Sequence, residues 1–262
     1  MANGAQTSII NAAIVAWQDA LAACQRMTNL FLIATVALAA LNLVYFGLAI
    51  VAFPGGLGLF GFLFGLIYAV AQSFLLTPLA LAVHRYLLLG ETIDAYRLDL
   101  QDARFKKFFT FLAGLALVMF IPRLIGDLLS SPFGPSALGR LVGFVLSIIA
   151  AVVLVRNVIL FPAVAVDAPG ADWRNAMADT QGHSWRVFFI LLCAILPAAI
   201  VAAVVLIVFA FIPLIGWLIA IAVQAAFGVF AVAATAAAAS RLYVDYARLL
   251  GRPFGVANQS AA

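Results

Sequence analysis

Two histidines and one glutamate are the side chains of this sequence best suited to acid–base chemistry or metal binding. His84 and Glu91 are seven residues apart, so a continuous helix would place them on one face. His183 precedes a later apolar stretch and is expected at the same end of the fold. Together they could hold a metal ion or act as acid and base. However, these residues do not follow the spacing of a metal site, and nothing else supplies a ligand at such a spacing. We therefore interpret the three as a weak polar cluster at helix ends, and we expect no metal, no cofactor and no catalytic activity.

A second set of polar residues lies within or beside long apolar stretches, where a polar path or a lipid contact would need them. No ionisable residue occurs deep in these stretches, which argues against ion-coupled transport and leaves a passive pore open. Hydrogen bonding between helices is the commoner role of buried amides. The candidates for a polar path or lipid contact are Asn42, Gln72, Arg123, Arg156, Asn157 and Gln224.

The two arginines of this set each allow more than one interpretation. Arg123 is four residues before Asp127, so it could pair with that carboxylate, bind a lipid head group or extend to the membrane surface. Arg156 precedes the apolar stretch 158–166. It fits either a substrate-binding arginine inside a bundle or an arginine at the membrane boundary followed by more apolar chain.

The elements that must position these residues follow from composition. The chain has 262 residues, of which 67% are hydrophobic and 9% are charged, whereas soluble domains carry about 25% charged residues. Such a chain is not an ordinary soluble enzyme, a disordered segment or a nucleic-acid module. The stretch 27–83 contains no charged residue or histidine, and its length suits two spanning helices of about 20 residues each. We therefore predict an all-α, multi-pass membrane protein.

The hydrophobic pattern predicts three parts. An amphipathic helix in 1–27 lies in the membrane interface, a six-helix transmembrane domain occupies 28–240, and a cytoplasmic tail occupies 241–262. The six helices form three hairpins, with expected spans at 28–53, 57–83, 108–125, 137–161, 187–211 and 217–240.

Basic residues predict the orientation. With six spans, twelve lysines and arginines fall on one side and only Arg123 and Arg140 on the other. Because basic loops stay in the cytoplasm, both termini are expected there, as in a protein of the bacterial inner membrane. Anionic lipid is the expected partner of this basic face. The twelve residues are Arg26, Arg85, Arg97, Arg104, Lys106, Lys107, Arg156, Arg174, Arg186, Arg241, Arg248 and Arg252.

A weak internal repeat accompanies this topology. Arg26, Lys106 and Arg186 precede the odd-numbered spans at intervals of 80 residues. A short amphipathic surface helix is expected before each of these spans, at 7–25, 92–104 and 172–181. The unit is thus a surface helix followed by a hairpin of two spans, repeated three times.

Small residues indicate close helix contacts. Gly58, Gly61 and Gly65 follow a small-xxx-small spacing, and 225–239 is rich in alanine. Packing within the chain explains most of this surface, and a membrane-protein partner or a second copy could use whatever remains exposed.

The stretch after the fourth span resembles a known family. Phe161-Pro162 leads through Asp167 and Gly170 to Ala176, and Trp185-Arg186 opens the fifth span. This plan is similar to the YciC-like bacterial six-span proteins and the related membrane domain attached to some glycerophosphodiester phosphodiesterases. The family tends to have a serine near the position of Asp179. The resemblance implies a six-span topology, and it carries over no phosphodiesterase activity because the catalytic domain is absent from this sequence.

These observations favour a non-enzymatic inner-membrane protein that acts as a structural or accessory scaffold on a membrane complex or on local lipid. The alternative is a passive transporter or lipid-handling protein with a polar path near Asn42, Gln72, Arg156 and Gln224. A continuous cavity lined by those residues would favour the alternative, and internal pairing of the same groups would favour the scaffold.

Overall fold

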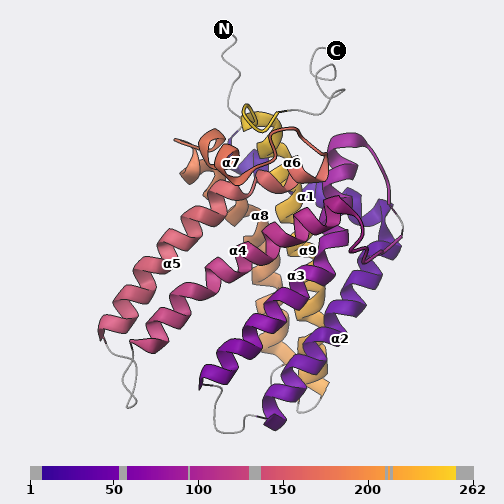
Figure 1. Ribbon diagram of the computed structural model, residues 1–262. Helices are drawn as coiled ribbons and strands as arrows, with labels where there is room; N and C mark the ends of the chain where they lie inside the picture. Colours follow the sequence, from indigo (N-terminus) through magenta and orange to yellow (C-terminus); the bar gives the residue numbers. More distant parts are fainter. Residues whose placement is uncertain are drawn as a thin grey trace.

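The computed structural model describes residues 8–52, 58–93, 95–129, 137–209, 212 and 215–251. Every regular element among these residues is an α-helix. Six of the described helices are long and apolar enough to cross a membrane. The prediction of an all-α fold with six spanning helices is therefore confirmed. They are α2 (Thr28–Ala52), α3 (Gly58–Leu89), α4 (Ala103–Leu128), α5 (Ala137–Asn157), α8 (Ser184–Phe209) and α9 (Ile215–Tyr246) (Figure 1).

Three of these helices extend beyond the expected spans at one end of the bundle. α3 continues to Leu89, α4 begins at Ala103 and α9 continues to Tyr246. The added turns carry polar residues, which can continue a helix once its apolar part is held by packing. We call this end the basic end, because it holds Arg26, Arg85, Arg104, Arg156, Arg186 and Arg241.

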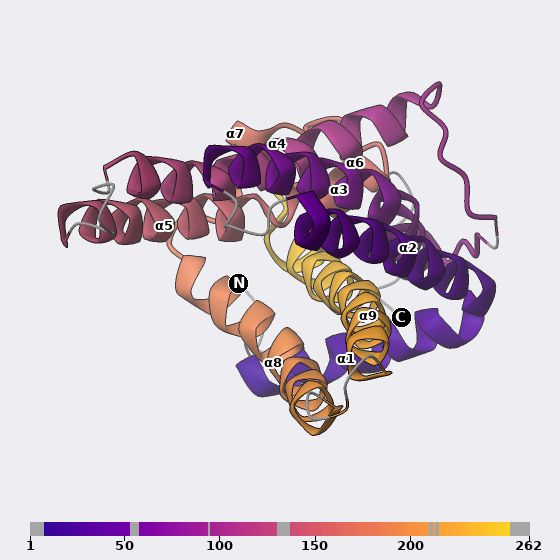
Figure 2. The same cartoon turned by 90° about the horizontal axis from the view of Figure 1, so that it is seen from below.

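The first helix, α1 (Ile9–Arg26), lies across the basic ends of α8 and α9 (Figure 2). Ser8 caps it by accepting a hydrogen bond from the Asn11 backbone N–H at 3.2 Å. Ile10, Ile14 and Leu21 stay exposed on its outer side, where an interfacial helix would contact lipid. Its buried face consists of alanines, namely Ala13, Ala16, Ala20 and Ala23.

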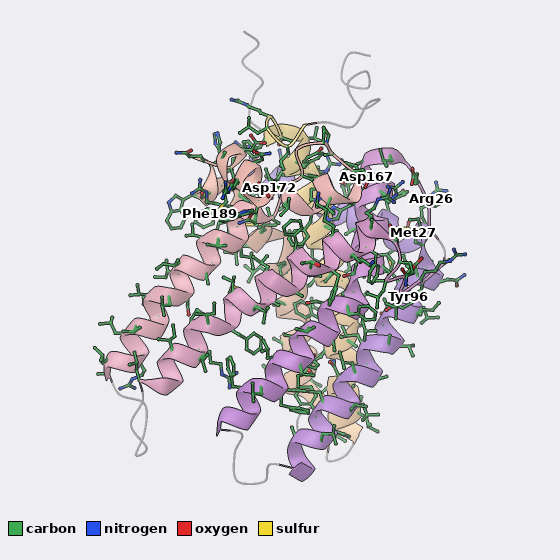
Figure 3. The ribbon with its side chains drawn as sticks, viewed as in Figure 1. Arg26, Met27, Tyr96, Asp167, Asp172 and Phe189 are labelled. Carbon is green, nitrogen blue, oxygen red and sulfur yellow. The ribbon has the colours of Figure 1, made fainter. Side chains whose placement is uncertain are left out.

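The prediction of a surface helix over 92–104 is wrong. The described residues between Leu89 and Ala103 contain no helix. Instead, Tyr96 from this segment lies lower on the flank of the bundle than Arg26 (Figure 3), and its hydroxyl donates to the Leu75 carbonyl at 2.6 Å. Leu75 lies three residues before Pro78 in α3, and the missing N–H of this proline leaves the neighbouring Phe74 carbonyl without its helical donor. The hydrogen bond to Leu75 holds the segment along the flank of the bundle. The second repeat therefore lacks its surface helix.

The span expected over 137–161 is divided. α5 ends at Asn157, and α6 (Leu160–Ala165) is a separate short helix with all six residues buried. α6 packs against α3, α4 and α9. The stretch 158–166 is therefore apolar because its side chains are buried inside the basic end. The short helix α7 (Trp173–Asp179) follows within the third predicted surface segment and packs against α5.

The segment after α6 and the last residue of α7 hold the chain that follows α9 in place. Both Asp179 carboxylate oxygens accept backbone N–H groups of residues 248–250, at 2.9 to 3.1 Å. Gly170 donates its N–H to the Leu250 carbonyl at 3.1 Å, and a Cβ at Gly170 would lie 2.1 Å from the Leu249 carbonyl oxygen. Asp167, at a φ of 53°, pairs with Arg104. Several residues of the family resemblance thus have structural roles here.

Burial is concentrated in the half of the bundle next to the basic end. The buried residues of α2, α3 and α8 fall mainly in 30–38, 73–84 and 187–194, and α9 is almost continuously buried over 233–243. Toward the opposite end, α4 and α5 lean away from α8 and α9 (Figures 1 and 2). The six helices are therefore packed most tightly at the basic end, and α4 and α5 diverge from α8 and α9 farther away.

Candidate functional site

A cavity of about 330 Å³ lies among the helices of the bundle. Its walls come from α3, α4, α5, α6 and α9, and they are almost entirely apolar. We call it the central cavity. Its polar or aromatic wall residues include Gln72, Ser73, His84, Phe108, Phe161 and Thr235.

The central cavity is long and lies within the membrane-spanning part of the bundle. Its wall on α3 runs from Gln72 to His84, a distance of about 18 Å along a helix. This is slightly more than half of the roughly 30 Å hydrocarbon thickness of a bilayer. The cavity is therefore long enough to extend through about one leaflet of a bilayer.

Two of the polar groups in the cavity wall lack an internal partner. Ser73 donates to the Ala69 carbonyl at 2.8 Å, so its hydroxyl is satisfied by its own helix. Within the described residues, the Gln72 amide and the Thr235 hydroxyl make no hydrogen bond to the protein. An unsatisfied polar group at membrane depth is costly. These two groups are therefore the ones to which a bound molecule could offer a hydrogen bond.

The cavity ends at a layer of packed rings near the basic end. The Phe108 ring lies 5.9 Å from the His84 ring and 5.1 Å from the Phe161 ring, measured between centroids. His84 is 2% exposed, and its Nδ1 lies 2.8 Å from the Ser240 hydroxyl oxygen. This pair connects α3 to α9, so His84 acts as a polar link between helices as well as a cavity wall.

The structure does not bring the predicted polar path together. Asn42 is 2% exposed and accepts a hydrogen bond from the Tyr68 hydroxyl at 2.6 Å. Gln224 faces outward from α9. Of the four residues expected along the path, Gln72 alone lines the central cavity. Spacing along a helix gives the depth of a residue, whereas its direction depends on how the helix is rotated in the bundle.

The remaining candidates lie at the two ends of the bundle. Arg156 donates through Nη2 to the Met177 carbonyl at 2.6 Å, which ties α5 to α7. Asn157 is buried and donates to the Val153 carbonyl at 2.8 Å. Arg123 is exposed near the far end of α4, and the side chain of Asp127 lies outside the described residues.

His84, Glu91 and His183 do not form one site. Glu91 is exposed and pairs with Arg85, whose Nε lies 2.8 Å from its carboxylate. The His183 ring stacks on Tyr246 with centroids 4.7 Å apart. Across the part of the chain that the structure describes, no group of three or more His, Cys, Asp or Glu side chains could hold a metal ion.

Some residues of the site and its supports were not identified from the sequence. The link of His84 to Ser240 joins residues 156 positions apart, and no local pattern encodes such a pair. Gly139 and Gly143 do follow a small-xxx-small spacing, which was a usable signal. A Cβ at Gly143 would lie 3.3 Å from the Pro122 carbonyl oxygen, so these glycines allow α5 to approach α4 closely.

Comparison with protein-family models, with curated proteins and with solved structures found no match to this chain. The class of the protein therefore follows from its own structure. Six apolar helices of spanning length define a multi-pass integral membrane protein.

Proposed function

We propose that this protein handles membrane lipid and binds a single hydrocarbon chain in the central cavity. The observation that carries the proposal is the cavity itself, which is long, almost entirely apolar and lined by helices of spanning length. Its volume of about 330 Å³ falls within the range of roughly 300–1,000 Å³ that is typical of small-molecule sites.

The chemistry of the walls favours a lipid over a column of water. A buried water needs two to four polar partners, and long sections of this cavity offer only Leu, Val and Ala side chains. A hydrocarbon chain gains from such walls about 25 cal/mol per Å² of buried apolar surface. A hydroxyl or carbonyl oxygen on the bound molecule would satisfy the Gln72 amide and the Thr235 hydroxyl.

A scaffold is the weaker interpretation, because the small-residue faces that favoured it are used within the chain. A Cβ at Gly65 would lie 3.4 Å from the Phe120 ring, so this face of α3 packs against α4. The alanines of α9 are buried over 233–239, apart from the cavity position Thr235. A membrane-protein partner would have to use other surfaces.

The proposal includes an orientation. Twelve basic residues on one side against two on the other support a cytoplasmic basic end in a bacterial inner membrane. The central cavity would then draw its lipid from the cytoplasmic leaflet.

Retained lipid tests the proposal directly. The wild-type protein and an Ala231→Phe variant would be purified from the same membranes, and retained lipids would be counted by native mass spectrometry. Ala231 lines the cavity, so a phenyl ring there fills the space. The matched control is Ala40→Phe, at an exposed position on α2.

We expect Ala231→Phe to retain one tightly held lipid fewer per chain than the wild type, with at least a tenfold lower occupancy of the central cavity. Ala40→Phe should retain as many lipids as the wild type. Size-exclusion chromatography would establish that both variants are folded. Equal occupancy in the folded variants would overturn the proposal. Recovery of a lipid-free protein with a stoichiometric protein partner would overturn it in favour of the scaffold.

A further inference from the structure

A second apolar space lies on another face of α5. α5 and α8 approach each other at the basic end and diverge below it (Figures 1 and 2), leaving a cavity of about 500 Å³. We call it the α5–α8 wedge. Its walls include Phe144, Ile148, Ala151 and Val155 of α5, with Trp185 and Phe188 of α8.

The wedge matches one leaflet in length. Its wall on α5 runs from Phe144 to Val155, which is about 16 Å along a helix and about half of the hydrocarbon thickness. It is also separate from the central cavity. Leu154 of α5 lines the central cavity, whereas Val152 and Val155 of the same helix line the wedge.

One arginine directly follows a wedge residue at the basic end, and a second lies on the short helix that the first one binds. Arg156 directly follows the wedge residue Val155 and binds α7 through the Met177 carbonyl. Its Nε is buried and has no hydrogen-bond partner among the described residues. Arg174 is exposed on the same short helix, α7.

Two carboxylates lie on or beside α7. Asp179 accepts the backbone N–H groups of residues 248–250, and Asp172 is exposed at the start of α7. Neither satisfies the buried Nε of Arg156, which has no hydrogen-bond partner among the described residues. A phosphate is an anion that a guanidinium group binds well at a membrane surface.

An aromatic residue marks the level of the membrane interface at the same place. Trp185 lies in the wedge wall and is 76% exposed. Its ring lies 6.2 Å from Phe189 and 6.1 Å from Phe188, so the three form one aromatic group. Tryptophan prefers the boundary between head groups and hydrocarbon. The wedge thus has an apolar lower part, an interfacial aromatic ring and a cationic mouth, in the order of a phospholipid's own parts.

We propose that the α5–α8 wedge binds an anionic phospholipid, with one acyl chain along α5 and its phosphate near Arg156 and Arg174. A zwitterionic phospholipid of the same chain length would gain the same apolar contacts but less from the two arginines. This inference goes beyond the proposed function, because it concerns a different cavity and a defined head-group charge.

Competition between two lipids tests the inference. The full-length protein would be placed in nanodiscs of equal parts phosphatidylglycerol and phosphatidylcholine with identical chains, and the lipids retained after release would be counted by native mass spectrometry. The variants are Arg174→Gln for the head group and Ala151→Phe for the chain. The matched controls are Arg140→Gln, exposed at the opposite end, and Ala40→Phe, exposed on α2.

Phosphatidylglycerol is expected to be retained in preference to phosphatidylcholine by the wild type. Arg174→Gln should lower this preference about fivefold, the effect expected of one cationic side chain near an anionic head group. Ala151→Phe should lower retention of both lipids at this site, and both controls should behave as the wild type. Absence of a preference in the wild type, or unchanged preference in Arg174→Gln, would overturn the inference.

The two proposals fail separately. The cavity-filling variant Ala231→Phe leaves the wedge open and should keep the phosphatidylglycerol preference. If it loses that preference while Ala151→Phe keeps it, the anionic lipid belongs to the central cavity and the wedge assignment is wrong. If both variants retain their lipids, both proposals are wrong.

Discussion

The half of the bundle next to the basic end and the half farther away consist of the same six helices, but different contacts hold them. Near the basic end, polar links join parts of the chain that are far apart in sequence. Arg104 binds Asp167, and Arg241 binds Asp19 at 2.5 Å across 222 positions. In the other half, the Tyr68–Asn42 bond joins the neighbouring helices α2 and α3. Tyr45 stacks on Phe64 across the same helix pair, with centroids 4.8 Å apart.

This difference separates the part that maintains the fold from the part that can admit a ligand. Long-range links at the basic end hold distant helices together, whereas the polar and aromatic contacts named in the other half join helices that follow one another in the chain. The central cavity and the α5–α8 wedge both lie where these two halves of the bundle meet.

The largest expected effect is at the contact between Gly170 and the end of α9. Gly170→Ala would place a Cβ 2.1 Å from the Leu249 carbonyl oxygen, so the backbone must move. We expect a loss of about 3 kcal/mol or more in the free energy of unfolding, measured by denaturant titration in detergent micelles. Gly114→Ala is the control, because its Cβ would meet nothing within 4 Å. A comparable loss in both variants would show that the basic end is not specially constrained.

A smaller difference is expected between two buried polar links, one in each half. His84→Ala leaves the buried Ser240 hydroxyl without its partner and opens space beside Phe108. We expect a loss of about 2–3 kcal/mol from the combined hydrogen-bond and cavity costs. Asn42→Ala removes the partner of Tyr68 and should cost about 1 kcal/mol. Thermal unfolding of both variants under one set of conditions measures the difference, and equal losses would contradict the proposed division of the bundle.

The smallest effect concerns the flank of the bundle and depends on pH. Burial raises the pKa of Tyr96 from 10.0 to about 12. Between these pH values the unfolded phenol ionises while the folded phenol stays protonated, so the stability that depends on its protonated form is lost as the pH rises. Below pH 10 this contribution is fully present. Unfolding of the wild type should therefore become easier from pH 10 to 12 relative to Tyr96→Phe, and parallel curves for the two proteins would exclude the effect.

The six spanning helices were predictable because membrane insertion depends on local composition. Each stretch of about 20 apolar residues satisfies its own backbone hydrogen bonds as a helix, whatever its neighbours are. The error at 92–104 has the opposite origin. That segment is shaped by one distant acceptor, the Leu75 carbonyl, and its amphipathic spacing carries no information about that acceptor.

The candidate site was predictable only in part for a related reason. Gln72 was recognised as a deep polar residue and does line the central cavity. Gln224, equally deep in its helix, faces outward. The helix pairs differ in rotation and tilt, and these are set by packing between distant segments. The separation of α6 from α5 was missed because a buried short helix and the end of a spanning helix have the same apolar composition.

The position of α1 has a consequence for how the protein is made. The Trp17 indole N–H donates to the Ala194 carbonyl at 2.6 Å, 177 residues later in the chain. At about 5–20 residues per second, a ribosome needs roughly 10–35 s to add that length. During this interval α1 has been synthesised but its binding surface on α8 and α9 has not. Its exposed stripe of Ile10, Ile14 and Leu21 lets the helix rest on the membrane surface until the last hairpin arrives.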